Sequence, residues 1–407
     1  MRSPFAATFS PRDLLWSGGG NDRMAFAVDM LVPRQVVDDF GRRAEPSTTL
    51  LRYEIELRYV ESPLPRLELT REHLAPLKFR EAKAIVGFPA RPAFLKAAVS
   101  PTRRIGSFVS TRTEVAADEE PGGIRLMLHQ DGGSRGQPIP AGLSPRTVVG
   151  GTNAAQYPTV LAARREMSSW QTLQLEPSVM RAPDPFGAPA RVDERGGHIA
   201  ATLQRLAGAD AIAGQTLAEA ANRLAALVSE VRSLNIDRDE ARQQLSLHAR
   251  VAGCEQTLGP RALSDGTLRF LALVTMQLDS ASSGVLCLEE PENGIHPARI
   301  GAMVDLLRDF AVDPQRAVAD DNPPRQVILN THSPEVVRQL DIDDVLFVDT
   351  VEDADGRSAI VAAVDGGWRT DMASVPVRRM ADFIGGSPLG APVRDLQLTP
   401  CPIRRKP

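Results

Sequence analysis

The stretch GVLCLEEPENGIHP, residues 284–297, decides the fold class of this chain. Its opening GVLCL carries no charge, which is typical of a strand that is covered on both faces. Glu289 and Glu290 follow at once, although adjacent carboxylates repel each other and are costly where water is scarce. Ligand sites of open α/β sheets lie beyond the carboxyl ends of the strands. The pair of acids therefore predicts a site at this edge of a parallel sheet.

The same pattern continues on both sides of this stretch. A helix is expected over 263–278, and further helices are expected from Pro297 and from Pro334. A second apolar strand, QVILN at 326–330, separates the last two. The polar residues that follow this strand are Thr331, His332 and Ser333. Alternation of helices with short apolar strands predicts an α/β fold, with a mainly parallel sheet flanked by helices.

The first part of the chain has a different pattern. In RYEIELRYV, residues 52–60, apolar and charged side chains alternate, which predicts an antiparallel strand with one buried face. MAFAVDM at 24–30 shows the same period of two. Helical spacing begins at 159–175 and continues through 198–208 and 216–234. A strand is expected at 241–251.

These patterns divide the chain into four regions. We expect a β-rich lobe over 1–150, a helical lobe over 151–240, a core with the acidic pair over 241–370 and a C-terminal tail over 371–407. Two further apolar runs, VLFVD at 345–349 and SAIVAAV at 358–364, are expected to complete the sheet of the core.

Composition limits the class of protein. The chain has 407 residues, is 43% hydrophobic and carries a formal net charge of −4, so it is not coated uniformly for nucleic acid. Three scattered cysteines exclude a disulfide framework and favour a reducing cytoplasm. The sequence has no signal-peptide pattern and no apolar stretch of transmembrane length, so no membrane partner is expected.

A divalent cation would give the two acids different roles. Mg²⁺ prefers oxygen ligands and keeps several waters, so one carboxylate can hold it through solvent. The other carboxylate can orient a water and accept its proton, which typically contributes about 10²–10⁴-fold. Taken alone, an acidic pair at a strand end is more often a solvated rim.

Two other motifs are equally ambiguous alone. Ser264, Asp265 and Gly266 open the expected helix, where free amides and the helix dipole favour a phosphate. The same residues are also ordinary capping residues. His332 fits a loop histidine as well as a functional one, and His296 fits a helix entry.

The order of the three motifs changes this balance. LSDGTLRFLAL, then LCLEEPENGIHP, then NTHSP resembles the second half of an ABC-type ATPase head of the RecF/SMC/OLD-like branch, a group of bacterial AAA-family ATPases. The resemblance covers residues 198–349 strongly and the β-rich part loosely. It implies a P-loop NTPase fold, with ATP and Mg²⁺ as ligands.

The resemblance also implies roles for individual residues. Ser264, Asp265 and Gly266 would belong to the signature motif that contacts ATP on a partner subunit. Glu289 would hold the Mg²⁺ shell, Glu290 would be the catalytic base and His332 the switch histidine. Asn293 would lie in the D-loop. Asp265 and Glu289 depart from the commoner glycine and aspartate of the wider family.

One family motif is absent. The chain contains no GxxxxGK[ST] loop to hold the phosphates of ATP. A truncated start is the preferred interpretation, because the acids and His332 are kept. A misplaced start codon or a fragment would explain such a start, and a degenerate ATPase is the alternative.

The expected function is that of an ATPase head that dimerises on ATP and drives a DNA-related or anti-phage process. The expected partner is a second copy or a related ATPase subunit, with DNA and an effector nuclease encoded nearby as further candidates. The rival function is a hydrolysis-incompetent subunit that donates its signature motif. A structural DNA clamp is disfavoured, since no sustained heptad run is present.

Overall fold

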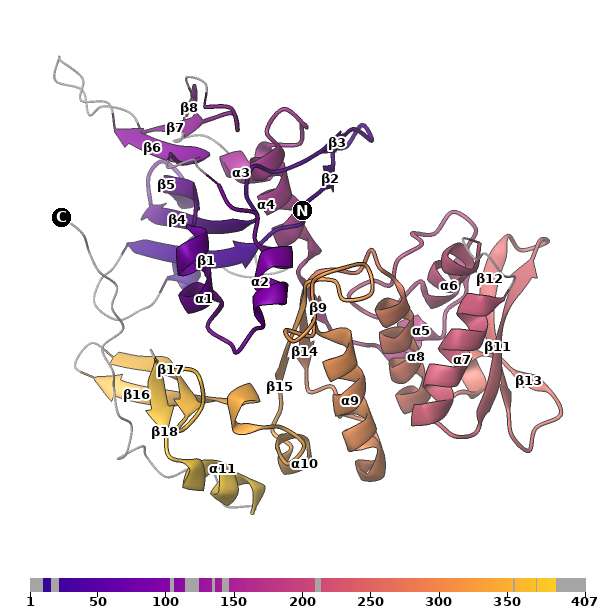
Figure 1. Ribbon diagram of the computed structural model, residues 1–407. Helices are drawn as coiled ribbons and strands as arrows, with labels where there is room; N and C mark the ends of the chain where they lie inside the picture. Colours follow the sequence, from indigo (N-terminus) through magenta and orange to yellow (C-terminus); the bar gives the residue numbers. More distant parts are fainter. Residues whose placement is uncertain are drawn as a thin grey trace.

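The computed structural model describes residues 10–15, 22–102, 106–113, 124–133, 136–140, 146–208, 214–353, 356–370 and 372–385. In Figure 1, a β-rich lobe, a helix-rich lobe and a small C-terminal sheet lie around a central sheet of three strands. The three central strands are parallel, whereas the other sheets are mainly antiparallel. The α/β fold class expected from the sequence is confirmed.

The N-terminal sheet is antiparallel and has the strand order β1-β4-β5-β6-β7-β8. Its strands are β1 (Arg23–Leu31), β4 (Leu50–Val60), β5 (Arg66–Pro76), β6 (Val109–Thr113), β7 (Ile124–Leu128) and β8 (Gln137–Pro140). The alternation read at 52–60 is confirmed, because Tyr53, Ile55 and Leu57 lie in one apolar cluster. That cluster packs against α3 (Val148–Gly151) and α4 (Pro158–Ser169).

A buried carboxylate joins this sheet to α3. Glu72 is fully buried on β5, where it accepts hydrogen bonds from the Tyr53 hydroxyl at 3.0 Å and from the amides of Val148 and Val149 at 2.6 and 2.9 Å. Burial raises the pKa of Glu72, and the two amides act in the opposite direction. The contact supplies acceptors for amides that a helix start leaves unpaired.

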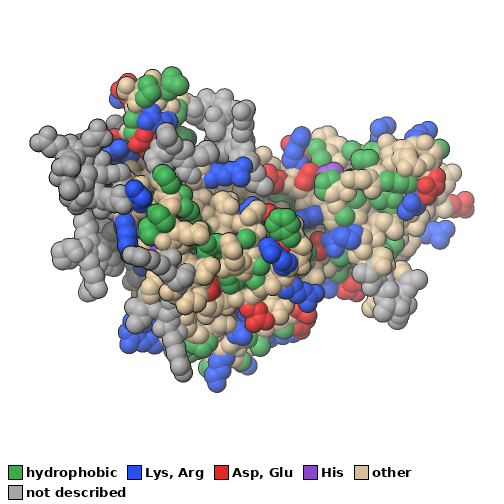
Figure 2. Space-filling view, turned by 90° about the horizontal axis from the view of Figure 1, so that it is seen from above, with side chains coloured by type: hydrophobic (Ala, Val, Ile, Leu, Met, Phe, Trp, Pro, Cys, Tyr) green, Lys and Arg blue, Asp and Glu red, His purple; other side chains and the backbone are tan. Residues whose placement is uncertain are grey.

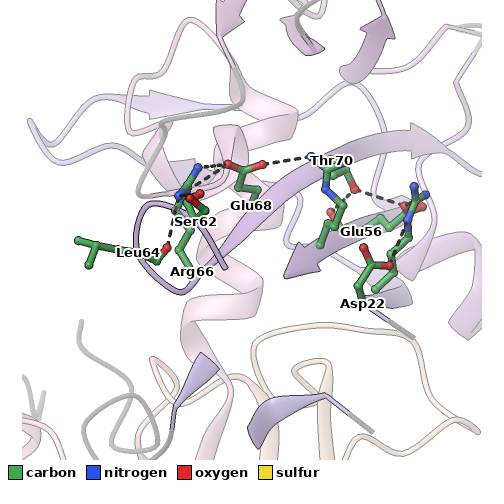
Figure 3. A network of polar contacts seen from close by, with 9 residues as sticks. Asp22, Glu56, Ser62, Leu64, Arg66, Glu68 and Thr70 are labelled. Atoms are coloured by element: carbon green, nitrogen blue, oxygen red, sulfur yellow. Dashed lines mark hydrogen bonds and ion pairs between the residues drawn. The ribbon is translucent and has the colours of Figure 1, made fainter. Parts of the chain in front are cut away.

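The tip of the β4–β5 hairpin is held by surface contacts (Figure 3). Arg66 donates to the carboxylate of Glu68 at 2.6 Å and to the carbonyls of Ser62 and Leu64. Thr70 donates to the carbonyl of Glu56 at 3.1 Å. Exposed ion pairs of this kind contribute about 0–1 kcal/mol each, so they shape the hairpin more than they stabilise the lobe.

A second hairpin is organised by one acid. Between β2 (Val36–Val37) and β3 (Arg43–Ala44), Asp38 accepts from the amides of Phe40 and Arg42 and from the Arg42 guanidinium. Burial acts to raise the pKa of Asp38, but these hydrogen bonds and one from the Ala155 amide prevail and lower it to about 2. Helices α1 (Phe79–Val86) and α2 (Pro92–Ala98) complete the lobe.

The central sheet has the order β15-β14-β9. It consists of β9 (Gln171–Leu173), β14 (Gly284–Glu289) and β15 (Arg325–Asn330), and it packs with α8 (Asp265–Leu278) and α9 (Ile300–Phe310). Both apolar strands predicted from the sequence are confirmed as parallel neighbours. The helix expected over 159–175 is shorter, since α4 ends at Ser169 and β9 follows.

Strand β15 lies at the edge of this sheet. Among the described residues it pairs only with β14. Ile328, near the middle of the strand, is 50% exposed.

The helix-rich lobe is formed by α5 (Pro177–Met180), α6 (Ile199–Ala207) and α7 (Gln215–Leu227), which accompany the sheet β10-β12-β11. Its strands are β10 (Asp184–Pro185), β11 (Val231–Asp239), β12 (Gln244–Val251) and β13 (Thr257–Leu258). The strand expected at 241–251 is confirmed. The helix expected over 216–234 ends at Leu227, because β11 takes up the residues from Val231 onward.

The C-terminal part forms its own sheet. Strands β16 (Leu346–Asp353), β17 (Gly356–Val364) and β18 (Ala373–Val375) pair with one another and lie beside α10 (Pro334–Val337) and α11 (Val377–Ile384). The expectation that 345–349 and 358–364 complete the central sheet is therefore wrong. Regular structure also continues to Ile384, within the segment expected to be a tail.

Short 3₁₀ turns link several elements: Pro11–Leu14, Pro260–Ala262, Pro297–Arg299 and Ile342–Asp344. Figure 2 shows basic and acidic side chains interspersed over the face that it draws, in keeping with the small net charge. None of the described helices is long and apolar enough to cross a membrane.

Candidate functional site

The carboxyl ends of the three parallel strands meet at one edge of the central sheet. The backbone register sets Glu289 beside Asn330, and Leu288 beside Leu173 of β9. Gln174, the acidic pair and residues 330–332 therefore leave the sheet at the same level. Convergence of polar side chains at this edge is what parallel strands produce.

The first acid, Glu289, is exposed at the end of β14. The Gln174 carboxamide donates to Glu289 Oε2 at 3.3 Å. Sequence reasoning missed Gln174, because β9 has only three residues and follows a helix without a break in apolar spacing. The sequence signal that could have indicated Gln174 is its place as a polar residue directly after Thr172 and Leu173.

The second acid has an unusual backbone. Glu290 has a φ of +42°, a left-handed value that residues with a side chain seldom adopt. The Glu290 amide donates two hydrogen bonds to Asn330, one to its backbone carbonyl oxygen at 3.1 Å and one to its side-chain Oδ1 at 3.0 Å. Strain of this kind is concentrated at functional sites.

The Glu290 carboxylate points to a different set of partners from Glu289. Asn293 Nδ2 donates to Glu290 Oε2 at 2.9 Å, and His332 Nε2 lies 3.6 Å from Oε1. The His332 side chain is 84% exposed. The backbone turn at Glu290 thus separates the two adjacent carboxylates, one toward β9 and the other toward the loop after β15.

The start of α8 lies beside the turn that follows the acids. A Cβ added to Gly266 would be 3.3 Å from the carbonyl oxygen of Gly294. Ser264 is the N-cap, and its side chain accepts from the Thr267 amide at 3.2 Å. Asp265 is paired with Arg181, which donates at 2.5 Å. The capping role considered for Ser264 is confirmed, and this bond leaves the α8 amides before Thr267 available to a ligand.

His296 and Ser333, two further polar residues near the site, lie at the starts of helical segments. His296 Nδ1 accepts from the Ala298 amide at 3.2 Å at the entry to the following turn, as expected for a helix start. Ser333 occupies the N-cap position of α10 but makes no side-chain capping bond. In the described ranges, no group of three or more His, Cys, Asp or Glu side chains could hold a metal ion by itself.

The segment that carries this edge of the sheet is similar to a known protein family. Residues 161–338 match the family model described as "AAA domain, putative AbiEii toxin, Type IV TA system". This segment is similar to the AAA domains of that family. The matched segment contains β9, β14 and β15 together with α8, and so includes every residue of the site. The resemblance to an ATPase head drawn from the order of the motifs is confirmed.

Several solved SMC heads are also similar to this chain. An Smc head bound to the C-winged helix domain of ScpA is 13% identical, with a TM-score of 0.35, over 75% of this chain and 77% of that one. The SMC head domain from Thermotoga maritima is 10% identical, with a TM-score of 0.26, over 77% and 98%.

A third match, the Smc head with an extended coiled coil from Pyrococcus furiosus, is 11% identical with a TM-score of 0.26. The match covers 36% of this chain and 34% of that longer one. Comparison with curated protein sequences gives no match.

Proposed function

We propose that this chain provides the hydrolytic edge and the signature helix of an ATPase head that hydrolyses Mg-ATP. The observation that carries the proposal is the divergence of Glu289 and Glu290 at the end of β14. One carboxylate contacts Gln174, and the other contacts Asn293 and lies beside His332. One acid that holds a cation and another that activates a water must point in different directions, as these two carboxylates do.

Glu290 is the proposed general base. Asn293 occupies its Oε2, so Oε1 is the oxygen free to accept a proton from an attacking water. His332 lies on the side of Oε1, where its ring can contact the same water or the γ-phosphate. Positioned proton transfer of this kind contributes about 10²–10⁴-fold to a rate.

Glu289 is the proposed acid on the side of the cation. The exposed carboxylate of Glu289 suits Mg²⁺ that arrives with the nucleotide and keeps several waters. When bound, Mg²⁺ would supply positive charge for the phosphates. Gln174 would hold Glu289 Oε2 in place from β9.

The signature helix is proposed to act on a second subunit. Ser264, Asp265 and Gly266 form the mouth of α8, where unpaired amides and the helix dipole attract a phosphate. Arg181 neutralises Asp265, whose charge would otherwise oppose an anion there. The partner is proposed to be a second copy or a related ATPase subunit, joined through a two-fold interface.

A specific observation favours a second candidate function. The 407-residue sequence contains no GxxxxGK[ST] motif. A chain without that loop could serve by donating its signature helix to a subunit that has one. The family description names an AbiEii-type toxin of a toxin–antitoxin system. We propose a DNA-related or anti-phage process for either function, with DNA and a nuclease effector as further partners.

Calorimetry with Mg-ATP tests whether this chain can hold the nucleotide by itself. The chain alone should show no binding in the low-micromolar range, because it lacks the lysine and the nest of amides that grip the β- and γ-phosphates. Tight binding would show that another part of the chain replaces the loop.

The catalytic roles are tested in a protein that pairs this chain with a phosphate-binding loop, in cis or from a partner. Glu290→Gln should retain ATP binding and lower turnover by about 10²-fold or more. Glu289→Gln, the matched control, should weaken Mg²⁺-dependent binding instead. Wild-type turnover by Glu290→Gln would exclude it as the base.

Action across a dimer is tested by mixing two inactive variants. Ser264→Arg places bulk at the mouth of α8, an exposed position, so the fold should remain intact. In a heterodimer of Ser264→Arg with Glu290→Gln, one site keeps an intact signature and an intact base. Partial recovery of hydrolysis is expected, whereas heterodimers without activity would contradict the proposal.

A further inference from the structure

The loops that follow β14 and β15 are joined by a side-chain contact outside the proposed catalytic set. The Thr331 hydroxyl donates to Glu292 Oε1 in a short hydrogen bond. The same hydroxyl oxygen accepts from the Ser333 amide at 2.9 Å. The two hydrogen bonds link the Glu292 carboxylate, the Thr331 hydroxyl and the Ser333 amide. Thr331 and Ser333 are the residues on either side of His332 in the sequence.

Glu292 is a costly residue for this position. Its Oε2 atom is buried and has no hydrogen-bond partner among the described residues. A buried acceptor that loses its hydration and gains no donor destabilises the folded state. If the position served stability alone, an apolar side chain would be better, and such local conflicts are typical of functional positions.

His332 depends on its backbone for its place. Because its side chain is 84% exposed, packing does not fix the imidazole relative to the Glu290 carboxylate, which lies 3.6 Å away. The position of the ring is set by residues 331–333. Within this segment, the Thr331 hydroxyl donates to Glu292 and accepts from the Ser333 amide.

We propose that Glu292 is a positioning residue, which holds the loop of His332 against the turn of Glu290 through the Thr331 hydroxyl. The catalytic purpose of this contact rests on the proposed function. The contact itself can be measured without ATP. Glu290 itself has a separate anchor, the carbonyl and side chain of Asn330. The two halves of the site can therefore be perturbed separately.

Four substitutions test the contact from both sides. Glu292→Gln keeps an oxygen that accepts from Thr331, and Thr331→Ser keeps the hydroxyl. Glu292→Leu and Thr331→Val remove the acceptor and the hydroxyl respectively at similar volume. Asn330→Ala is the matched control, because it removes the side-chain acceptor of the Glu290 amide and leaves the contact between Glu292 and Thr331.

The first readout is hydrogen exchange of the Ser333 amide in this chain without nucleotide. Glu292→Leu and Thr331→Val should each speed exchange by about tenfold, the scale of one hydrogen bond. Glu292→Gln, Thr331→Ser and Asn330→Ala should stay near wild type. The double variant Glu292→Leu with Thr331→Val should be no faster than either single variant, because both break one series of bonds.

The second readout is the NMR signal of the His332 ring, which should move toward that of an unstructured histidine only in the variants that lose the contact. Unchanged Ser333 exchange and an unchanged ring signal in Glu292→Leu and Thr331→Val would overturn the proposal. Neither readout uses ATP, so failure of the proposed hydrolysis would be seen separately, as turnover that does not depend on Glu290.

Discussion

The left-handed backbone of Glu290 predicts a reversal of the usual order of alanine and glycine. The residue has a φ of +42°, held by two hydrogen bonds from its amide to Asn330. Glycine reaches this region freely, whereas a residue with a Cβ pays a steric cost there. Replacing Glu290 by Ala and by Gly removes the same carboxylate, so the two variants differ only at the backbone and the Cβ.

The magnitude follows from two opposing effects. A left-handed conformation costs a residue with a Cβ about 1–2 kcal/mol relative to glycine. Against this, glycine loses about 0.5–1 kcal/mol relative to alanine through its greater freedom when unfolded. Glu290→Gly should therefore be more stable than Glu290→Ala by about 0.5–1 kcal/mol. At Glu289, which has no positive φ, the same pair should show the opposite order.

The assay is urea unfolding of the four variants, followed by a spectroscopic signal of the central sheet. The comparison uses midpoints at equal slopes, so that changes in the unfolded state can be recognised. If Glu290→Ala equals or exceeds Glu290→Gly in stability, the backbone of Glu290 is not strained in solution. The separation of the two carboxylates would then need another explanation.

Three further predictions concern stability. Asp38 has a pKa lowered to about 2, so its contribution is present above pH 3.8 and is lost as the pH falls toward 2; acid titration of Asp38→Asn should lack this loss. Glu72→Ala should cost about 3 kcal/mol or more in urea unfolding, because three buried donors lose their acceptor, and a cost below 1 kcal/mol would contradict that account. Arg325 is buried over the Phe310 ring and donates to three carbonyls, so Arg325→Lys should lower the unfolding midpoint, since an ammonium cannot replace the planar fork.

The sequence was sufficient where a local pattern determines the structure. Alternation at 52–60 identified β4, and an uncharged run ending in Glu289 and Glu290 identified both β14 and the edge that carries the site. Each inference needs only a period or a strand end. The neighbouring strand 326–330 was found in the same way, and its position beside β14 followed from the alternation with helices.

The remaining features depend on contacts between distant residues. Gln174 could not be found, because a three-residue strand has no measurable period and, among the described residues, joins the sheet through β14 alone. Helical spacing was read through residues 216–234, so the end of α7 at Leu227 and the start of β11 at Val231 were missed. The positive φ of Glu290 is not encoded by its residue type, and it accompanies two hydrogen bonds that the Glu290 amide donates to Asn330, a residue distant in the sequence.

The open edge of β15 has a consequence for handling this protein. Its outer N–H and C=O groups have no partner strand among the described residues, and the half-exposed Ile328 lies midway along it. An edge of this kind is a template on which extended chains can assemble, and it lacks the lysine or proline that commonly protects such strands. We expect the purified chain to become turbid as its concentration rises. Low protein concentration and mild denaturant should delay that loss, whereas sulfate should hasten it.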